Sequence, residues 1–248
     1  MHTSACANQK GGTGKTSTTV HLGYALARAG RRVLLVDMDP QASLTHYFIK
    51  DPTALEATVY TALIDHQEIK PLSIGEYLWL LPANIDLAAA EVRLPSKRNN
   101  ERALARLLNQ YAYDYCLIDC PPSLGILTVN ALSAAQRLLI PTATEIMSER
   151  TMPIILDLVK EVRESQLNPS LMVWRILPTL FDSRLAHHKE ILEVLRAKYG
   201  SLVYEEPVKS TTKYKDASGM RVDIRELDPR LGEYWDRLAA VLMAESER

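Results

Sequence analysis

Short apolar runs alternate with helical repeats of apolar residues along the 248-residue chain. The runs that predict buried strands are Thr3–Gln9, Arg32–Asp37, Tyr77–Pro82, Tyr113–Asp119, Arg137–Pro141 and Leu171–Leu177. The stretches that predict helices are Lys15–Ala29, Glu101–Asn109, Gly125–Ala135, Met152–Ser165 and Ala186–Lys198. This alternation predicts one α/β domain over residues 1–248, with a mostly parallel, twisted sheet covered by helices on both faces.

The C-terminal stretch Leu231–Met243 repeats apolar residues at helical spacing and predicts an amphipathic helix. Its polar face carries Glu233, Asp236 and Arg237. A helix that binds anionic lipid is rich in Lys and Arg, which this face is not. We therefore expect this helix to pack on its own domain, and we expect no association with a membrane.

The net charge and the cysteines limit which binding partners and which cellular compartment we expect. The formal charge of −1 favours no particular partner, so any binding to DNA must come from a local patch. Of the three cysteines, Cys116 and Cys120 lie four residues apart in a predicted strand, about 13 Å from Cα to Cα, which is too far for a disulfide. We predict a reducing, cytoplasmic location, with no structural zinc and no signal peptide.

A glycine-rich segment lies between the first predicted strand and the first predicted helix. Residues 10–16 read KGGTGKT and fit the deviant P-loop pattern K-G-G-x-G-K-[ST], whereas the general P-loop pattern fails at Gln9. Such a loop and the helix after it bind phosphate through backbone N–H groups. Lys15 is expected to reach the β and γ phosphates of ATP, and Thr16 to ligate Mg²⁺. The predicted nucleotide-binding residues here are Gly11, Gly12, Thr13, Gly14, Lys15, Thr16 and Ser17.

Acidic residues stand at the ends of two further predicted strands: Asp37 and Asp39 after one, and Asp119 after the other. Ligand sites of parallel sheets gather at the carboxyl ends of strands, so these acids are expected to converge on the P-loop. Asp119 is expected to hold Mg²⁺ through water, and Asp39 to orient the attacking water. The predicted metal site comprises Thr16, Asp39 and Asp119, and Lys15 and Asp39 are predicted catalytic residues.

Three segments together resemble the ParA/Soj family of DNA-partition ATPases, within the larger group that includes MinD. They are KGGTGKT at residues 10–16, VDMDPQAS at 36–43 and LIDCPPSLG at 117–125. The resemblance continues, with weaker motifs, through residues 177–184 and 228–230. It implies a fold of the P-loop NTPase type over essentially the whole chain.

The resemblance implies an ATPase that forms an ATP-sandwich homodimer, in which Lys10 reaches the partner's nucleotide and acts as a third catalytic residue. The dimer is expected to bind duplex DNA without sequence preference, on the nucleoid. A ParB-like partner is expected to stimulate hydrolysis. Pro178 and Pro207 are two further predicted nucleotide contacts. Because the P-loop begins near residue 9, we expect no N-terminal winged-helix domain.

The C-terminal third carries the basic residues from which a DNA-binding patch is predicted. Arg184 and Lys213 match basic positions that the family uses for DNA, and Lys209 is the third predicted contact. Lys189 and Lys215 complete the patch. No recognition helix is apparent, so we expect contacts to the DNA backbone rather than to base edges.

Three alternatives of other classes stay open. A MinD-like membrane-associated ATPase would need a basic C-terminal amphipathic helix. An iron–sulfur protein of the nitrogenase-iron-protein kind would need paired cysteines at a dimer axis. A small-molecule ligase or kinase would use the same fold and the same P-loop.

Overall fold

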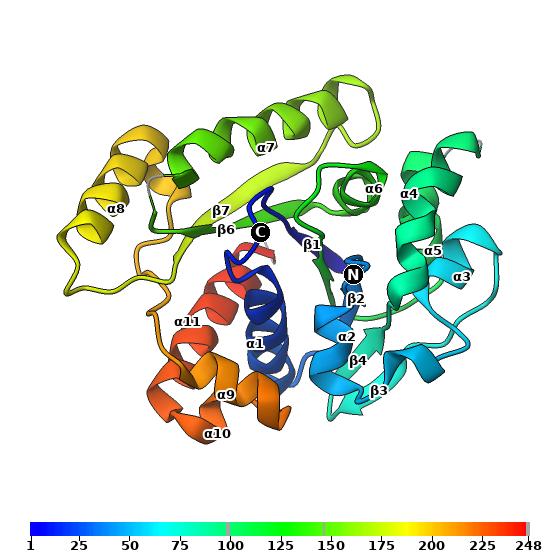
Figure 1. Ribbon diagram of the computed structural model, residues 1–248, viewed down its shortest axis with the longest axis horizontal. Helices are drawn as coiled ribbons and strands as arrows, with labels where there is room; N and C mark the ends of the chain where they lie inside the picture. The colour runs from blue at the N-terminus through cyan, green and yellow to red at the C-terminus, as the bar shows by residue number, and fades with distance from the viewer. Residues whose placement is uncertain (98–99, 146, 247–248) are drawn as a thin grey trace.

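The computed structural model describes residues 1–97, 100–145 and 147–246, with the backbone alone for residues 147–150. A seven-stranded sheet of order β3-β4-β2-β5-β1-β6-β7 runs through the molecule (Figure 1). The strands are β1 (His2–Cys6), β2 (Val33–Asp37), β3 (Leu72–Gly75), β4 (Leu78–Leu81), β5 (Tyr115–Asp119), β6 (Arg137–Ala143) and β7 (Met172–Thr179). Every neighbouring pair is parallel except β3 and β4, which confirms a mostly parallel sheet.

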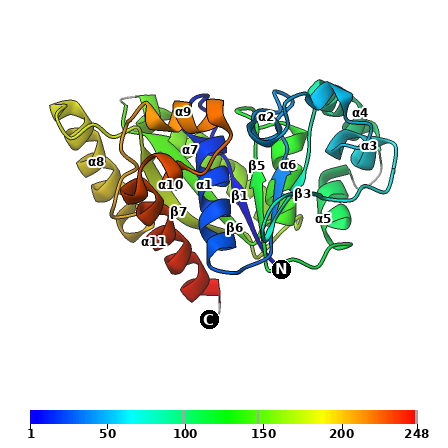
Figure 2. The ribbon, with the colours of Figure 1, turned by 90° about the horizontal axis from the view of Figure 1, so that it is seen from below.

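Helices cover both faces of the sheet, as the alternating pattern predicts (Figures 1 and 2). They are α1 (Lys15–Arg28), α2 (Ser43–Phe48), α3 (Val59–Ile64), α4 (Ala90–Arg93), α5 (Ala103–Leu108), α6 (Ile126–Ala134), α7 (Met147–Glu164), α8 (Ala186–Tyr199), α9 (Lys213–Met220), α10 (Ile224–Leu227) and α11 (Pro229–Ser246). Helices α1, α2 and α9–α11 lie on one face, and α3–α8 lie on the other.

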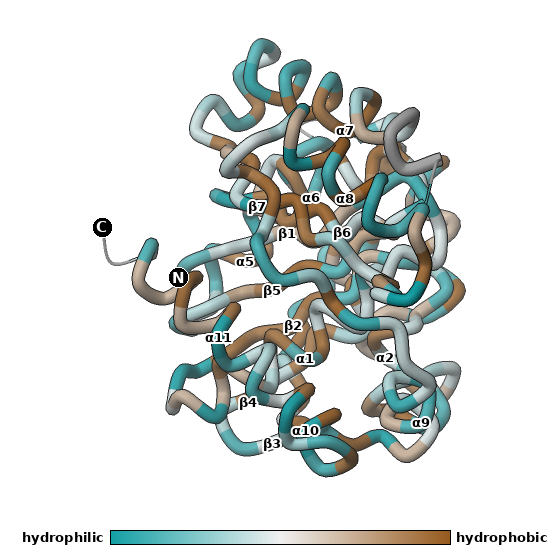
Figure 3. Tube along the Cα trace, turned by 90° about the vertical axis from the view of Figure 1, so that its left-hand side faces the viewer, coloured by the Kyte–Doolittle hydropathy of each residue, from teal (hydrophilic) through white to brown (hydrophobic). Residues whose placement is uncertain are grey.

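Each face of the sheet buries its own apolar core. Along β2, Leu34 and Val36 belong to the core under α3, α5, α6, α7 and α8, whereas Leu35 belongs to the core under α1 and α11. All five residues of β2 and of β5 are buried, as expected for central strands covered on both sides. Figure 3 shows the same arrangement, with hydrophobic chain concentrated along the strands.

The pattern located the long elements and missed the short ones. Six predicted strands are present, with ends that differ by up to three residues, but β3 was not predicted because it is half-exposed and pairs antiparallel with β4. The helix predicted over Glu101–Asn109 begins as a 3₁₀ turn and becomes α5 at Ala103. The helix predicted from Met152 begins at Met147, with Pro153 inside it.

The C-terminal helix α11 packs on its own domain, as predicted. Trp235, Leu238 and Leu242 are buried against α1 and its neighbours. At the far end of α11, the Trp174 indole N–H donates to the Glu245 carboxylate at 2.6 Å. The apolar face of α11 is therefore covered, and no helix among the described residues is long and apolar enough to cross a membrane.

Candidate nucleotide and metal site

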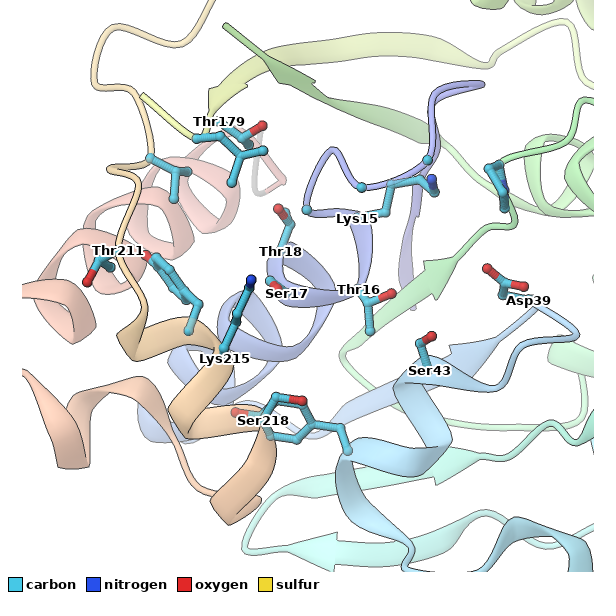
Figure 4. A pocket seen from close by; sticks show the side chains of 18 of the residues that line it. Lys15, Thr16, Ser17, Thr18, Asp39, Ser43, Thr179, Thr211, Lys215 and Ser218 are labelled. Carbon is cyan, nitrogen blue, oxygen red and sulfur yellow. The ribbon is translucent and has the colours of Figure 1, made fainter. Parts of the chain in front are cut away.

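A cavity of about 460 Å³ lies beside the P-loop at the carboxyl edge of the parallel strands (Figure 4). The residues that line it come from the P-loop and α1, from the loops after β2 and β5, from α2, from the end of β7, from α9 and the segment before it, and from α11. The predicted site residues that contribute to its wall are Gly11, Gly12, Gly14, Lys15, Thr16, Ser17, Asp39 and Lys209, whereas Thr13 and Asp119 are not among the lining residues. The convergence predicted from strand ends is therefore present in the fold.

Two glycines give the P-loop its path. Gly12 and Gly14 have φ values of +71° and +85°, in the left-handed region where any side chain is strained. Gly14 is the residue before α1, so the helix begins directly after this turn. The Thr179 hydroxyl donates to the carbonyl oxygen of Thr13 at 2.8 Å and ties the loop to the end of β7. The loop and the amino end of α1 thus present a phosphate-binding arrangement.

Lys15 is 7% exposed, and its Nζ donates to the carbonyl oxygen of Lys10 at 3.2 Å. The ammonium group therefore lies within the turn of the P-loop, where β and γ phosphates would meet it. Lys10 points elsewhere and forms an ion pair with Glu145, in the loop after β6. Within one chain, the two lysines therefore occupy different surroundings.

Asp119 is completely buried at the end of β5. The Thr16 hydroxyl donates to its Oδ2 at 2.7 Å, while its Oδ1 is buried without a hydrogen-bond partner among the described residues. Burial, and next the nearby Asp37, raise the pKa of this carboxyl well above its usual range. A divalent cation would supply what this orphaned oxygen lacks. A carboxylate next to a hydroxyl is a donor set that suits Mg²⁺, which usually keeps several water ligands.

Asp37 and Asp39 are two residues apart but have different surroundings. The buried Asp37 carboxylate accepts hydrogen bonds from the Thr45 backbone and hydroxyl at 2.8 and 2.7 Å. Burial raises the pKa of Asp37 to about 7. Asp39 lines the cavity, and one of its oxygens accepts from the Gln41 backbone N–H at 2.9 Å. Asp37 is thus occupied in holding the loop and α2, whereas Asp39 faces the space beside the P-loop (Figure 4).

The two predicted proline contacts are not among the residues that line the cavity. Pro178 lies in β7, and its carbonyl oxygen accepts from the Val208 N–H at 2.8 Å. This bond brings the segment after Pro207 against the end of β7. Residues that follow the two prolines contribute to the lining instead: Thr179, Leu180, Val208 and Lys209.

Sequence reasoning missed one side of the cavity. This side is aromatic and polar, and its members are Ser43, Tyr47, Thr211, Tyr214, Lys215, Ser218 and Trp235. They come mainly from the short helices α2 and α9, which carry no strong hydrophobic period. Behind the three aromatic rings lies His21, whose burial lowers its pKa to about 3.

The predicted DNA-binding residues fall into different settings. Arg184 has an 86% exposed side chain and pairs with Asp182, while Lys213 pairs with Asp228 at 2.7 Å. Lys209 lines the nucleotide cavity, as does Lys215. A backbone hydrogen bond from Ser210 to Phe181 places the Arg184 loop beside the Lys209 segment. The Arg184 loop and the Lys209 segment are therefore neighbours, and Lys209 and Lys215 also face the cavity.

The fold and the site define a class of protein. A P-loop at the carboxyl edge of a mostly parallel sheet, with a lysine, a hydroxyl and a buried acid converging there, is the arrangement of an α/β P-loop ATPase. The family described as AAA domain matches residues 1–173.

Within that class, the chain belongs to the ParA/Soj family of partition ATPases. It is 37% identical to the sporulation initiation inhibitor protein Soj of Bacillus subtilis (strain 168), over 91% of each chain. It is 43% identical to the chromosome partitioning protein ParA of Myxococcus xanthus (strain DK1622), over 80% of this chain and 71% of that protein. The resemblance found in the sequence is confirmed.

Solved structures show the same fold. Cobyrinic acid a,c-diamide synthase from Mycobacterium smegmatis, with bound ADP and magnesium, superposes with a TM-score of 0.86 at 36% identity. The match covers 100% of this chain and 97% of that one. The same protein is also known with a bound ATP analogue and magnesium. The single α/β domain of P-loop ATPase type is therefore confirmed.

Proposed function

We propose that this chain is a DNA-partition ATPase that dimerises around ATP, binds duplex DNA in that state, and releases it after hydrolysis. One arrangement carries the proposal. The Lys15 ammonium lies in the turn of the P-loop, the Thr16 hydroxyl donates to Asp119, and Asp39 lines the cavity beside them. The loop residues Gly11–Ser17, Lys15 among them, bind the phosphates of ATP. Thr16 and Asp119 hold Mg²⁺, which supplies charge neutralisation at the phosphates when bound.

Hydrolysis of ATP depends mainly on the positioning of the attacking water and on neutralisation of the charge on the phosphate oxygens. Asp39 faces the cavity and has one oxygen held by the Gln41 N–H, so its other oxygen orients the attacking water. Lys15 offsets the negative charge that spreads over the phosphate oxygens. Asp37 supports Asp39 indirectly, because its Oδ1 accepts the Asp39 backbone N–H at 3.1 Å.

Dimerisation is assigned to Lys10, which serves the nucleotide of a facing subunit. Lys10→Ala is expected to leave ATP affinity within about threefold of wild type, because Lys15 already serves the phosphates within the chain. The ATP-induced dimer is expected to disappear, as measured by analytical ultracentrifugation with ATP and Mg²⁺. Glu145→Gln is the matched control, since it breaks the same ion pair and keeps Lys10. A normal ATP dimer of Lys10→Ala would contradict the assignment.

DNA binding is assigned to the basic patch formed by Arg184, Lys209 and Lys213. With a net charge of −1, one chain should bind DNA weakly, whereas a dimer presents two copies of the patch. Arg184→Ala combined with Lys213→Ala is expected to lower ATP-dependent duplex affinity at least about tenfold and to reduce its salt dependence. The measurement is a DNA titration at two salt concentrations, with ATP and with ADP.

A control variant separates the loss of the Lys213 charge from the loss of the ion pair that Lys213 forms. Lys213 also pairs with Asp228, so its loss alters the start of α11. Asp228→Asn breaks the same ion pair without removing a positive charge, and it should retain DNA binding. Equal binding with ATP and ADP in the wild type would contradict the coupling of DNA to nucleotide. If the double variant bound DNA as tightly as the wild type, other residues would make the DNA contacts.

The remaining elements of the proposal are a ParB-like protein that stimulates hydrolysis and a cytoplasmic location on the nucleoid. The relative named as a cobyrinic acid synthase raises an amide-forming activity as the competing class. The relatives named as the partition proteins Soj and ParA match this chain at 37% and 43% identity, so the partition ATPase is the better-supported function.

A further inference from the structure

The segment after Asp119, the buried acid predicted to hold Mg²⁺, is held by α4, a helix that lies about 30 residues earlier in the sequence. Residues 120–125 connect Asp119 to α6, and Pro122 in this segment lines the nucleotide cavity. Glu91 of α4 reaches this segment from the side of the sheet that carries α6. In Figure 1, α4 and α6 stand next to each other at the edge of that layer.

The Glu91 carboxylate takes the place of a missing helix cap. Gly125, the residue before α6, has no side chain to cap the helix. The Ile126 N–H instead donates to Glu91 Oε2 at 3.2 Å, and the Ser123 hydroxyl donates to Glu91 Oε1 at 3.4 Å. A carboxylate at this end of a helix is also favoured by the helix dipole.

Gly125 makes this approach possible. A Cβ at residue 125 would lie 2.5 Å from Glu91 Oε2 and 2.8 Å from Oε1, closer than real Cβ contacts. The segment is held from its other side by Thr128, whose hydroxyl donates to the Ser123 carbonyl oxygen at 2.6 Å. Ser123 is thus clamped between Glu91 and α6, three residues from Cys120 and one from Pro122.

We propose that Glu91 is a positioning residue for ATP hydrolysis: it holds residues 120–126 so that Asp119 and Pro122 keep their places at the nucleotide. Glu91 is not among the residues that line the cavity, and it acts through Ser123 and Ile126. Glu91 is half-buried in α4, between the buried Ala90 and the exposed Val92, and its carboxylate meets residues 123–126 rather than solvent alone.

The test compares Glu91→Ala, Glu91→Gln, Gly125→Ala and the double variant Glu91→Ala/Gly125→Ala. The readouts are single-turnover hydrolysis at saturating ATP and Mg²⁺, ATP affinity, and circular dichroism at the assay temperature. Glu91→Ala is expected to slow hydrolysis about tenfold while ATP affinity stays within about threefold. Glu91→Gln keeps one acceptor oxygen and the shape of the side chain, so about a threefold loss is expected.

Gly125→Ala should slow hydrolysis about as much as Glu91→Ala, because the new methyl group displaces the carboxylate. In the double variant the clash is gone, so adding Gly125→Ala to Glu91→Ala should cost less than twofold, a non-additive result that shows direct coupling. Unchanged hydrolysis in folded Glu91→Ala and Glu91→Gln would overturn the proposal, and so would additive losses in the double variant. This proposal rests on the proposed function, so the wild type is measured in the same assay. An inactive wild type would contradict the proposed function, whereas an active wild type with equally active variants would contradict the role of Glu91.

Discussion

Replacing Lys15 by alanine is expected to lower ATP affinity about 100-fold, equivalent to about 2.7 kcal/mol, and to abolish detectable hydrolysis. The reason is the position of the ammonium group: it is 7% exposed and lies inside the P-loop turn, beside the Lys10 carbonyl. No other lysine of the loop points there, since Lys10 pairs with Glu145. The measurement is ATP binding by calorimetry, together with phosphate release.

The fold should survive this change. Among the described residues the Lys15 side chain donates to a backbone carbonyl, and its charge lowers the pKa of the buried Asp119. Without Lys15, Asp119 can take up a proton and keep its hydrogen bond from Thr16, so no unpaired charge has to stay buried. Lys160→Ala is the control, because Lys160 is an exposed lysine of α7 in an ion pair with Glu164 and should leave ATP binding unchanged. If Lys15→Ala bound ATP as tightly as the wild type, the nucleotide site would lie elsewhere.

The second large effect is expected at Asp39. Asp39→Ala should bind ATP within about threefold of wild type and hydrolyse it about 100- to 1,000-fold more slowly, because positioning of the water is lost while the phosphate contacts remain. ATP-bound dimer should then accumulate. Single-turnover hydrolysis with radiolabelled ATP measures the rate, and sedimentation measures the dimer.

Asp37 is the informative comparison for this result. Its carboxylate is occupied by the Thr45 backbone and hydroxyl, so Asp37→Asn should disturb folding stability more than the chemical step. Normal turnover in Asp39→Ala, together with slow turnover in a folded Asp37→Asn, would transfer the water-orienting role to Asp37. The structure distinguishes these two acids by their surroundings, which the printed sequence alone does not.

The elements whose signal is local were predictable from the sequence. Strands β2 and β5 are buried on both faces, so each is a continuous apolar run that needs no knowledge of its neighbours. The P-loop is recognisable for a similar reason, because Gly12 and Gly14 adopt positive φ values that glycine tolerates. Placing Asp39 and Asp119 near Lys15 followed from the rule that parallel strands share one carboxyl edge.

Only the tertiary structure decided which neighbours each side chain meets. Lys209 and Lys215 are predicted DNA-binding residues, and the tertiary structure shows in addition that both line the cavity beside the P-loop, because α9 and the segment before it lie there. The contact between Glu91 and Ile126 joins residues 35 positions apart and has no local pattern. Long-range packing of short, weakly periodic segments sets such contacts. The sequence by itself therefore determined the six parallel strands, the P-loop and the family, whereas packing of the short helices decided the rest: α2 and α9 line the cavity, and α4 holds the segment after Asp119.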